Sequence, residues 1–183
     1  KLFNQSLNFD TSNVINMSGM FESAESFNKT LNFNTKKVTN MAYMFAGVGS
    51  FNQPLNFNTE NVLNINGMFY CANSFNQPLN FNTENVRSMS SMFEHAKSFN
   101  QPLNFNTNNV NNMAWMFCGA KSFNQPLNLI NTSNVTNMNG MFSSTESFNQ
   151  PLKFVINQDT EINSMFEFCP ISEKNKPVFR ILI

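Results

Sequence analysis

The chain has 183 residues, with 11 basic and 11 acidic side chains, a formal net charge of +0 and 12% charged residues. A neutral, charge-poor chain excludes a basic nucleic-acid groove, a polybasic membrane anchor and an acidic disordered tail. The sequence contains no run of about 18 apolar residues, so no membrane-spanning helix is expected.

A repeat dominates the sequence and sets the order of the predicted elements. Phenylalanine recurs with a period of 24, with one step of 25 introduced by Ile130. The repeated residues are Phe3, Phe27, Phe51, Phe75, Phe99, Phe123 and Phe148. Such a period is typical of a solenoid, in which each coil covers the apolar face of its neighbour. We predict a single solenoid of about seven coils over residues 1–169 and a capping segment over 170–183, with an edge strand from 178.

The first half of each coil is predicted to contain a connector, a strand and a turn, as in residues 51–61. Segment 51–54 (Phe-Asn-Gln-Pro) is a connector, because proline cannot donate a hydrogen bond to a central strand ladder. Segment 55–57 (Leu-Asn-Phe) alternates apolar and polar residues, which predicts a short parallel strand with one buried face. Segment 58–61 (Asn-Thr-Glu-Asn) is typical of a turn.

The second half of each coil is predicted to contain an extended segment and a helical turn. Residues 62–65 are interpreted as extended chain, with the start of a helix as the alternative. From Ile65 to Ala72, apolar side chains follow at the spacing of one face of an amphipathic helix. Gly67 and the shortness of the segment limit that helix to one or two turns, with a 3-10 conformation as an alternative. The predicted fold class is therefore an α/β repeat solenoid, in which each coil carries a short parallel strand and a short helical turn.

Apolar residues at equivalent positions of successive coils, here called columns, are predicted to form the core. A leucine, a methionine and a second phenylalanine recur in every coil besides the phenylalanine already described. In one coil they are Leu55, Met68 and Phe69. Buried columns of this kind give a core that is adequate for the length of the chain.

The unit Phe-Asn-Gln-Pro-Leu-Asn-Phe-Asn-Thr-x-Asn-Val-x-Asn-Met-x-x-Met-Phe-x-x-Ala resembles the BspA-like leucine-rich repeat of bacterial surface proteins. It is most similar to the mycoplasma-type lipoprotein repeat of unknown function. Phe57 stands where that family often has Trp, and Asn61 lies one residue later than the general leucine-rich pattern places it. The resemblance implies a right-handed, leucine-rich-repeat-like stack of 24–25-residue coils, exposure at the cell surface and a role in interaction or adhesion.

Asparagines occupy two kinds of column. The asparagine after the first phenylalanine of each coil is predicted to form a structural ladder, with ligand contact as the alternative. The predicted ladder comprises Asn28, Asn52, Asn76, Asn100, Asn124 and Asn149. Asparagines that point out of the predicted sheet are candidates for binding a partner, with a solvated amide surface as the alternative. These candidates are Asn32, Asn56, Asn80, Asn104 and Asn128, together with Asn34, Asn58, Asn82 and Asn106.

Two further columns suggest other functions. Tyr43 and Trp115 interrupt a column of small residues and are candidate interface anchors, with packing between neighbouring coils as the alternative. The threonine column that includes Thr59 raises the alternative of an ice-binding array, for which charged neighbours such as Glu60 are poorly suited.

No metal, cofactor or catalytic chemistry is expected. His95 is the only histidine and no Cys-x-x-Cys occurs, so no metal site is predicted. Cys71, Cys118 and Cys169 lie about two coils apart, beyond disulfide reach, and are predicted to be free thiols. The sequence has no convergent acid-base pair, G-x-S-x-G motif or phosphate loop, so an enzyme is not expected.

The sequence thus predicts a non-enzymatic recognition or adhesion module that binds a protein or glycan through an exposed face of the solenoid. Its expected location is extracellular or at the bacterial cell surface, as the resemblance implies. A structural spacer or stalk in a larger surface protein is the alternative. Because the sequence begins inside a repeat unit, end-to-end association through an uncapped N-terminal coil is a further expectation.

Overall fold

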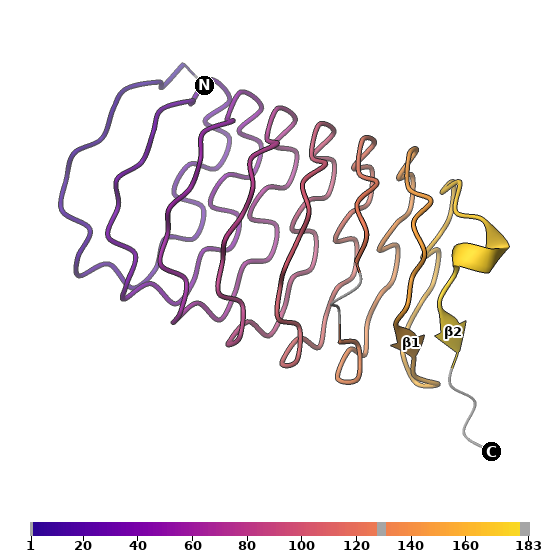
Figure 1. The fold of residues 1–183 in the computed structure, drawn as a ribbon. Helices are drawn as coiled ribbons and strands as arrows, with labels where there is room; N and C mark the ends of the chain where they lie inside the picture. The colour runs from indigo at the N-terminus through magenta and orange to yellow at the C-terminus, as the bar shows by residue number, and fades with distance from the viewer. Residues whose placement is uncertain (1, 128–130, 180–183) are drawn as a thin grey trace.

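The chain winds into successive coils that lie side by side along one axis (Figure 1). The computed structural model describes residues 2–127 and 131–179. Parallel bridges join Asn16 to Asn40, Asn40 to Asn64 and Asn64 to Ser88, and the same column of bridges continues to Glu161. Equivalent residues of adjacent coils therefore lie next to one another, and one sequence repeat corresponds to one turn of the chain.

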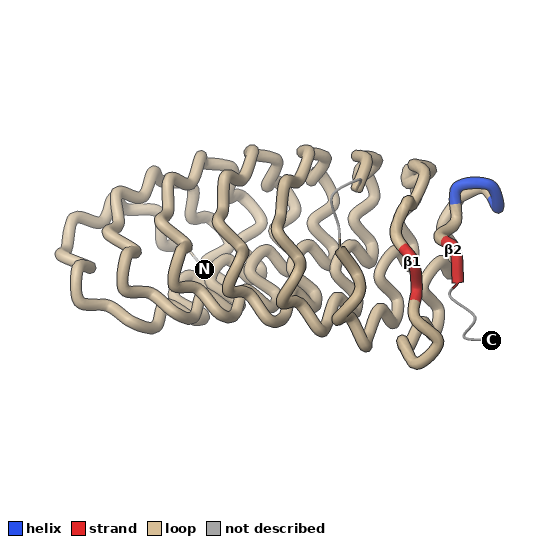
Figure 2. The backbone as a smooth tube through the Cα atoms, turned by 60° about the horizontal axis from the view of Figure 1, so that its bottom comes forward, coloured by secondary structure: helices blue, strands red, loops and turns tan. Residues whose placement is uncertain are grey.

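Regular elements are confined to the C-terminal part of the described chain, and the rest is loop and turn (Figure 2). Strand β1 (Val155–Ile156) pairs in parallel with strand β2 (Val178–Phe179), with Val155 opposite Val178. The 3-10 helix η1 (Glu173–Asn175) lies between them in the sequence. Strand β2 thus adds a parallel segment beside the coil that precedes it. Among the described residues, no helix is long and apolar enough to cross a bilayer.

The segment predicted to be extended, residues 62–65, supplies backbone pairing between coils. The Leu63 N–H donates to the Thr39 carbonyl at 2.9 Å, and the Met41 N–H donates to the Asn64 carbonyl at 2.9 Å. Both bonds join the segment to the preceding coil, and the Arg87 N–H of the next coil donates to the Leu63 carbonyl at 3.1 Å. Asn64 forms parallel bridges to both neighbouring coils. Extended chain is therefore the correct interpretation of this segment.

The segment predicted to be a helical turn, residues 65–72, folds instead as three overlapping tight turns. The Met68 N–H donates to the Ile65 carbonyl at 3.2 Å, the Tyr70 N–H to the Gly67 carbonyl at 3.0 Å, and the Ala72 N–H to the Phe69 carbonyl at 3.0 Å. Each bond closes a four-residue turn. The apolar spacing correctly predicts which side chains are buried here, but it does not predict the backbone.

Left-handed residues explain why no helix forms. Gly67 has φ 57° and Cys71 has φ 54°, and the equivalent positions of other coils also have positive φ. A right-handed helix cannot include such residues, because its backbone requires negative φ. The Phe69 N–H donates to the Met92 carbonyl of the next coil at 2.9 Å, where a helix would have bonded within itself.

The strands predicted at Leu-Asn-Phe segments such as 55–57 are not formed in residues 2–127. No backbone hydrogen bond joins these segments of that range to adjacent coils. Side-chain hydrogen bonds described below join the coils here in place of a backbone ladder.

Phenylalanine rings fill the interior as two interleaved stacks. The centroid of Phe69 lies 5.7 Å from those of Phe45 and Phe93, and 4.0 Å from that of Phe75 in the other stack. The planes of these pairs differ by 3–9°. Phe69 and Phe75 are fully buried, and the buried apolar side chains form one cluster along the described chain. Each offset ring pair contributes about 0.5–1.5 kcal/mol beyond its buried area.

Candidate functional site

The first outward column of candidate asparagines is exposed. Asn56 lies between the buried side chains of Leu55 and Phe57, and neighbouring coils repeat this alternation. Within the described residues, the side chains of Asn32, Asn56 and Asn80 form no internal hydrogen bond. This column, hereafter the Asn56 column, comprises the exposed residues Asn32, Asn56, Asn80 and Asn104. Asn128, predicted to belong to it, lies outside the described residues.

The second outward column is partly committed to turn formation. The Asn58 Oδ1 accepts the Glu60 N–H at 3.0 Å, which closes an Asx turn. The same bond, at 3.0–3.2 Å, is accepted by Asn34, Asn58, Asn82 and Asn106. These side chains are exposed, but their oxygen atoms are occupied. The Asn56 column therefore offers more free hydrogen-bonding groups to a partner.

The asparagines of the predicted ladder are hydrogen-bonded from coil to coil. The Asn52 Oδ1 accepts the Asn76 N–H at 2.9 Å and the Gln77 Nε2–H at 3.1 Å. The backbone bond, at 2.9–3.0 Å, is accepted by Asn28, Asn52, Asn76, Asn100, Asn124 and Asn149. These bonds join adjacent coils where backbone pairing is missing, which makes this column part of the scaffold.

The rings of Tyr43 and Trp115 each lie against a glycine of the next coil. A Cβ placed on Gly67 would lie 2.2 Å from the Tyr43 ring, and one on Gly140 would lie 2.2 Å from the Trp115 ring. The two aromatic residues remain 44% and 40% exposed. Packing between coils and an accessible aromatic surface are therefore combined in the same side chains.

A shallow hollow of about 410 Å³ is lined by Leu63, Asn85, Arg87, Asn109 and Asn111. Leu63, Arg87 and Asn111 are equivalent residues of three successive coils. The hollow offers two side-chain chemistries, amides and one guanidinium, beside an exposed leucine. Sequence reasoning missed this hollow. The signal that could have found it is Arg87, which follows the exposed Leu63 by one coil in the same column.

The threonine column is buried, so it does not supply the exposed hydroxyl array on which the ice-binding alternative is based. Thr59 is 4% exposed, and its Oγ1–H donates to the Asn82 carbonyl of the next coil at 2.9 Å. Equivalent bonds, at 2.6–3.1 Å, are donated by Thr11, Thr35, Thr59, Thr83, Thr107 and Thr132. An ice-binding surface needs exposed hydroxyls, whereas these hydroxyls join the coils.

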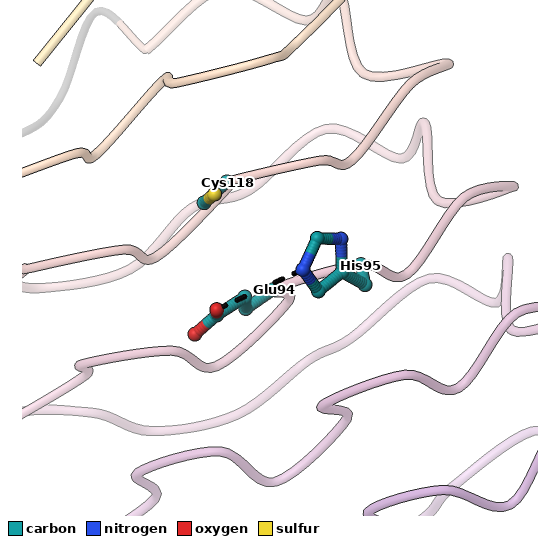
Figure 3. Close-up of side chains that lie close together, drawn as sticks. All are labelled: Glu94, His95 and Cys118. Carbon is teal, nitrogen blue, oxygen red and sulfur yellow. Dashed lines mark ion pairs between the residues drawn. The ribbon is translucent and has the colours of Figure 1, made fainter. Parts of the chain in front are cut away.

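Three potential metal ligands, Glu94, His95 and Cys118, lie together on adjacent coils (Figure 3). Their ligand atoms are within 4.8 Å of one another, and Glu94 Oε1 is 3.9 Å from His95 Nε2. Burial, with the neighbouring Glu94 carboxylate, raises the pKa of the Cys118 thiol above its ordinary value. All three cysteines of the chain are free.

Sequence reasoning missed this cluster because it considered His95 alone. The available signal was the repeat: Cys118 follows Glu94 by one coil in the same column, and His95 is the next residue after Glu94. Stacking the coils brings the three together although no metal-binding motif is present in the linear sequence.

The stacked coils define the chain as a repeat protein. The chain matches the family described as Mycoplasma protein of unknown function, DUF285, over residues 1–103 and again over residues 79–178. It therefore belongs to this family and is a mycoplasma-type repeat protein. No curated protein and no solved structure matches it.

Proposed function

We propose that the chain is a non-enzymatic recognition or adhesion module at the bacterial cell surface, and that it binds a protein or glycan through the Asn56 column. The observation that supports this proposal is a set of exposed asparagines in successive coils. The described side chains of Asn32, Asn56 and Asn80 form no internal hydrogen bond, so their polar groups are available to a partner.

The chemistry of these side chains suits a polymeric polar ligand. A free amide group offers two N–H donors and one carbonyl acceptor, which complement sugar hydroxyls or an extended peptide backbone. Because equivalent amides recur at the coil repeat, one ligand can contact several of them. The continuous core keeps them in place, which reduces the entropy lost on binding. Tyr43 and Trp115 add rigid aromatic surface of the kind that is enriched at interfaces.

The fold we propose for this module is a right-handed, leucine-rich-repeat-like solenoid of the BspA type. Support comes from the repeat unit, from the parallel bridges between adjacent coils and from membership of a mycoplasma repeat family. An extracellular location is part of the same proposal, because a recognition module of this kind requires access to partners outside the cell.

The experiment is to screen the purified chain against glycans and matrix proteins on one array and then to test variants against the ligands found. Asn56→Ala/Asn80→Ala should weaken binding by at least about fivefold, since each lost hydrogen bond is worth about 0.5–1.5 kcal/mol. Ser74→Ala/Ser98→Ala, in another exposed column of the adjacent coils, is the matched control and should bind normally. If no glycan and no matrix protein on the array binds, the structural spacer is favoured instead. If both variants bind equally, the Asn56 column is not the binding surface.

A further inference from the structure

Glu94, His95 and Cys118 bring one oxygen, one nitrogen and one sulfur ligand from two adjacent coils to one place (Figure 3). Glu94 and His95 follow one another on one coil, and their Oε1 and Nε2 atoms are 3.9 Å apart. Cys118 comes from the next coil, and all three ligand atoms lie within 4.8 Å of one another. No other group of three histidine, cysteine or carboxylate side chains in the described parts of the chain meets this criterion.

Backbone hydrogen bonds fix the two coils that carry these ligands. The His95 N–H donates to the Cys118 carbonyl at 2.7 Å, which ties the histidine directly to the residue that supplies the sulfur. The Glu94 N–H donates to the Ser91 carbonyl at 3.1 Å, and the Cys118 N–H donates to the Trp115 carbonyl at 3.1 Å. Glu94 and Cys118 thus each close a turn and His95 is bonded to the next coil, so the three side chains start from fixed backbone positions.

The imidazole is positioned by a glycine and a tyrosine. A Cβ on Gly119 would lie 2.2 Å from His95 Nδ1, so the absence of a side chain at this residue admits the ring. The Tyr70 ring meets the His95 ring edge-on, with centroids 6.3 Å apart and planes at 74°. His95 Nε2, the nitrogen nearer the Glu94 carboxylate, remains available as a ligand atom.

We propose that Glu94, His95 and Cys118 form a Zn²⁺-binding site that links two adjacent coils. Zinc accepts this mixture of oxygen, nitrogen and sulfur ligands, and three protein ligands are the usual number when a fourth position is left open. Zinc–ligand bonds of about 2.0–2.3 Å place tetrahedral ligand atoms roughly 3.3–3.8 Å apart. Closing the cluster therefore requires movements of about 1 Å, which side-chain rotation of Glu94 and His95 supplies.

The exposure of the cluster suits reversible binding of an ion. The Cys118 side chain is buried, whereas the Glu94 and His95 side chains are 19% and 45% exposed, so the ion enters from their side. Cys118 binds as the thiolate, and its proton passes to solvent when the metal enters. The fourth position faces solvent and takes a water molecule or a donor atom of a partner. Bound zinc stabilises the folded chain by mass action, because all three ligands meet only in the stacked coils.

The test uses the chelator-treated chain, which is titrated with Co²⁺ and then with Zn²⁺. One equivalent of Co²⁺ should produce thiolate-to-metal charge-transfer absorption in the near ultraviolet, and Zn²⁺ should abolish it. Cys118→Ser should remove this band, and His95→Gln and Glu94→Gln should each weaken Zn²⁺ binding at least tenfold in competition with a chromophoric chelator. Cys169→Ser keeps the cluster intact and should bind like the unchanged chain.

Thermal unfolding with and without Zn²⁺ separates loss of the site from loss of the fold. The unchanged chain and Cys169→Ser should gain thermal stability with Zn²⁺, whereas Glu94→Gln should unfold normally without the metal and gain little with it. The proposal is overturned if the unchanged chain binds Zn²⁺ no more tightly than Cys118→Ser does, or if the Co²⁺ complex lacks the thiolate band.

Discussion

The asparagine ladder makes a quantitative prediction about stability at Asn76. The Asn76 Oδ1 accepts the Asn100 N–H at 2.9 Å and the Gln101 Nε2–H at 3.2 Å. Asn76→Ala removes both bonds and leaves a half-buried backbone N–H without an acceptor. Loss of a partner of this kind costs about 1–3 kcal/mol, and the second bond adds little because Gln101 also donates to the Asn76 backbone carbonyl. We expect the free energy of unfolding to fall by about 1.5–2.5 kcal/mol.

Urea unfolding followed by circular dichroism measures this loss, and Asn80→Ala in the exposed Asn56 column is the matched control. Its side chain forms no hydrogen bond within the described residues, so the control should change the free energy of unfolding by less than about 0.5 kcal/mol. Equal losses in the two variants, or a loss below about 0.5 kcal/mol for Asn76→Ala, would contradict the structural role assigned to the ladder.

Three other changes test the core, the aromatic–glycine contact and a buried thiol. Phe75→Ala empties a fully buried position and should lower the free energy of unfolding, measured in urea, by about 3–5 kcal/mol. A loss below about 1 kcal/mol would refute the continuous stack. Gly67→Ala should lower the free energy of unfolding by at least about 0.5 kcal/mol more in the unchanged chain than in the Tyr43→Ala variant, because only the unchanged chain has the Tyr43 ring against this residue. Equal losses in the two backgrounds would refute the contact. Burial raises the pKa of the Cys169 thiol, so its alkylation should reach half-maximal rate above pH ~8.5. Since the unfolded thiol ionises first, the free energy of unfolding should fall as pH rises from ~8.5 through the folded pKa, and Cys169→Ser should lack this contribution.

The sequence predicts burial better than backbone conformation. The spacing from Ile65 to Ala72 identifies the inward side chains, but three overlapping turns satisfy that spacing as well as a helix does. Gly67 permits positive φ, yet Ser91 and Trp115 adopt it in the same column, so residue type alone does not reveal the turns. Hydrogen bonds to the next coil stabilise this strained backbone, and no single repeat contains that information.

Contacts between coils also determine which of the predicted site residues are exposed and which are buried. Exposure of the Asn56 column follows from alternation and could be predicted, whereas burial of Thr59 could not, because it depends on a carbonyl of the next coil. The cluster of Glu94, His95 and Cys118 is visible in the sequence only when columns of adjacent coils are read together. A search for motifs along the linear chain therefore does not find sites that are formed by residues of two coils.

Cysteine cross-linking tests the central claim most directly, namely that equivalent residues of consecutive coils lie side by side. In a background with the native cysteines replaced by serine, Asn40→Cys/Asn64→Cys joins two residues that are bridge partners in adjacent coils. Paired strands place their Cα atoms about 4.8 Å apart, within disulfide reach, so this pair should oxidise to an intramolecular disulfide. Asn40→Cys/Ser88→Cys spans two coils, about 9.6 Å, and should stay reduced. Failure of the first pair to cross-link, or equally rapid cross-linking of the second, would contradict the stacking of the coils.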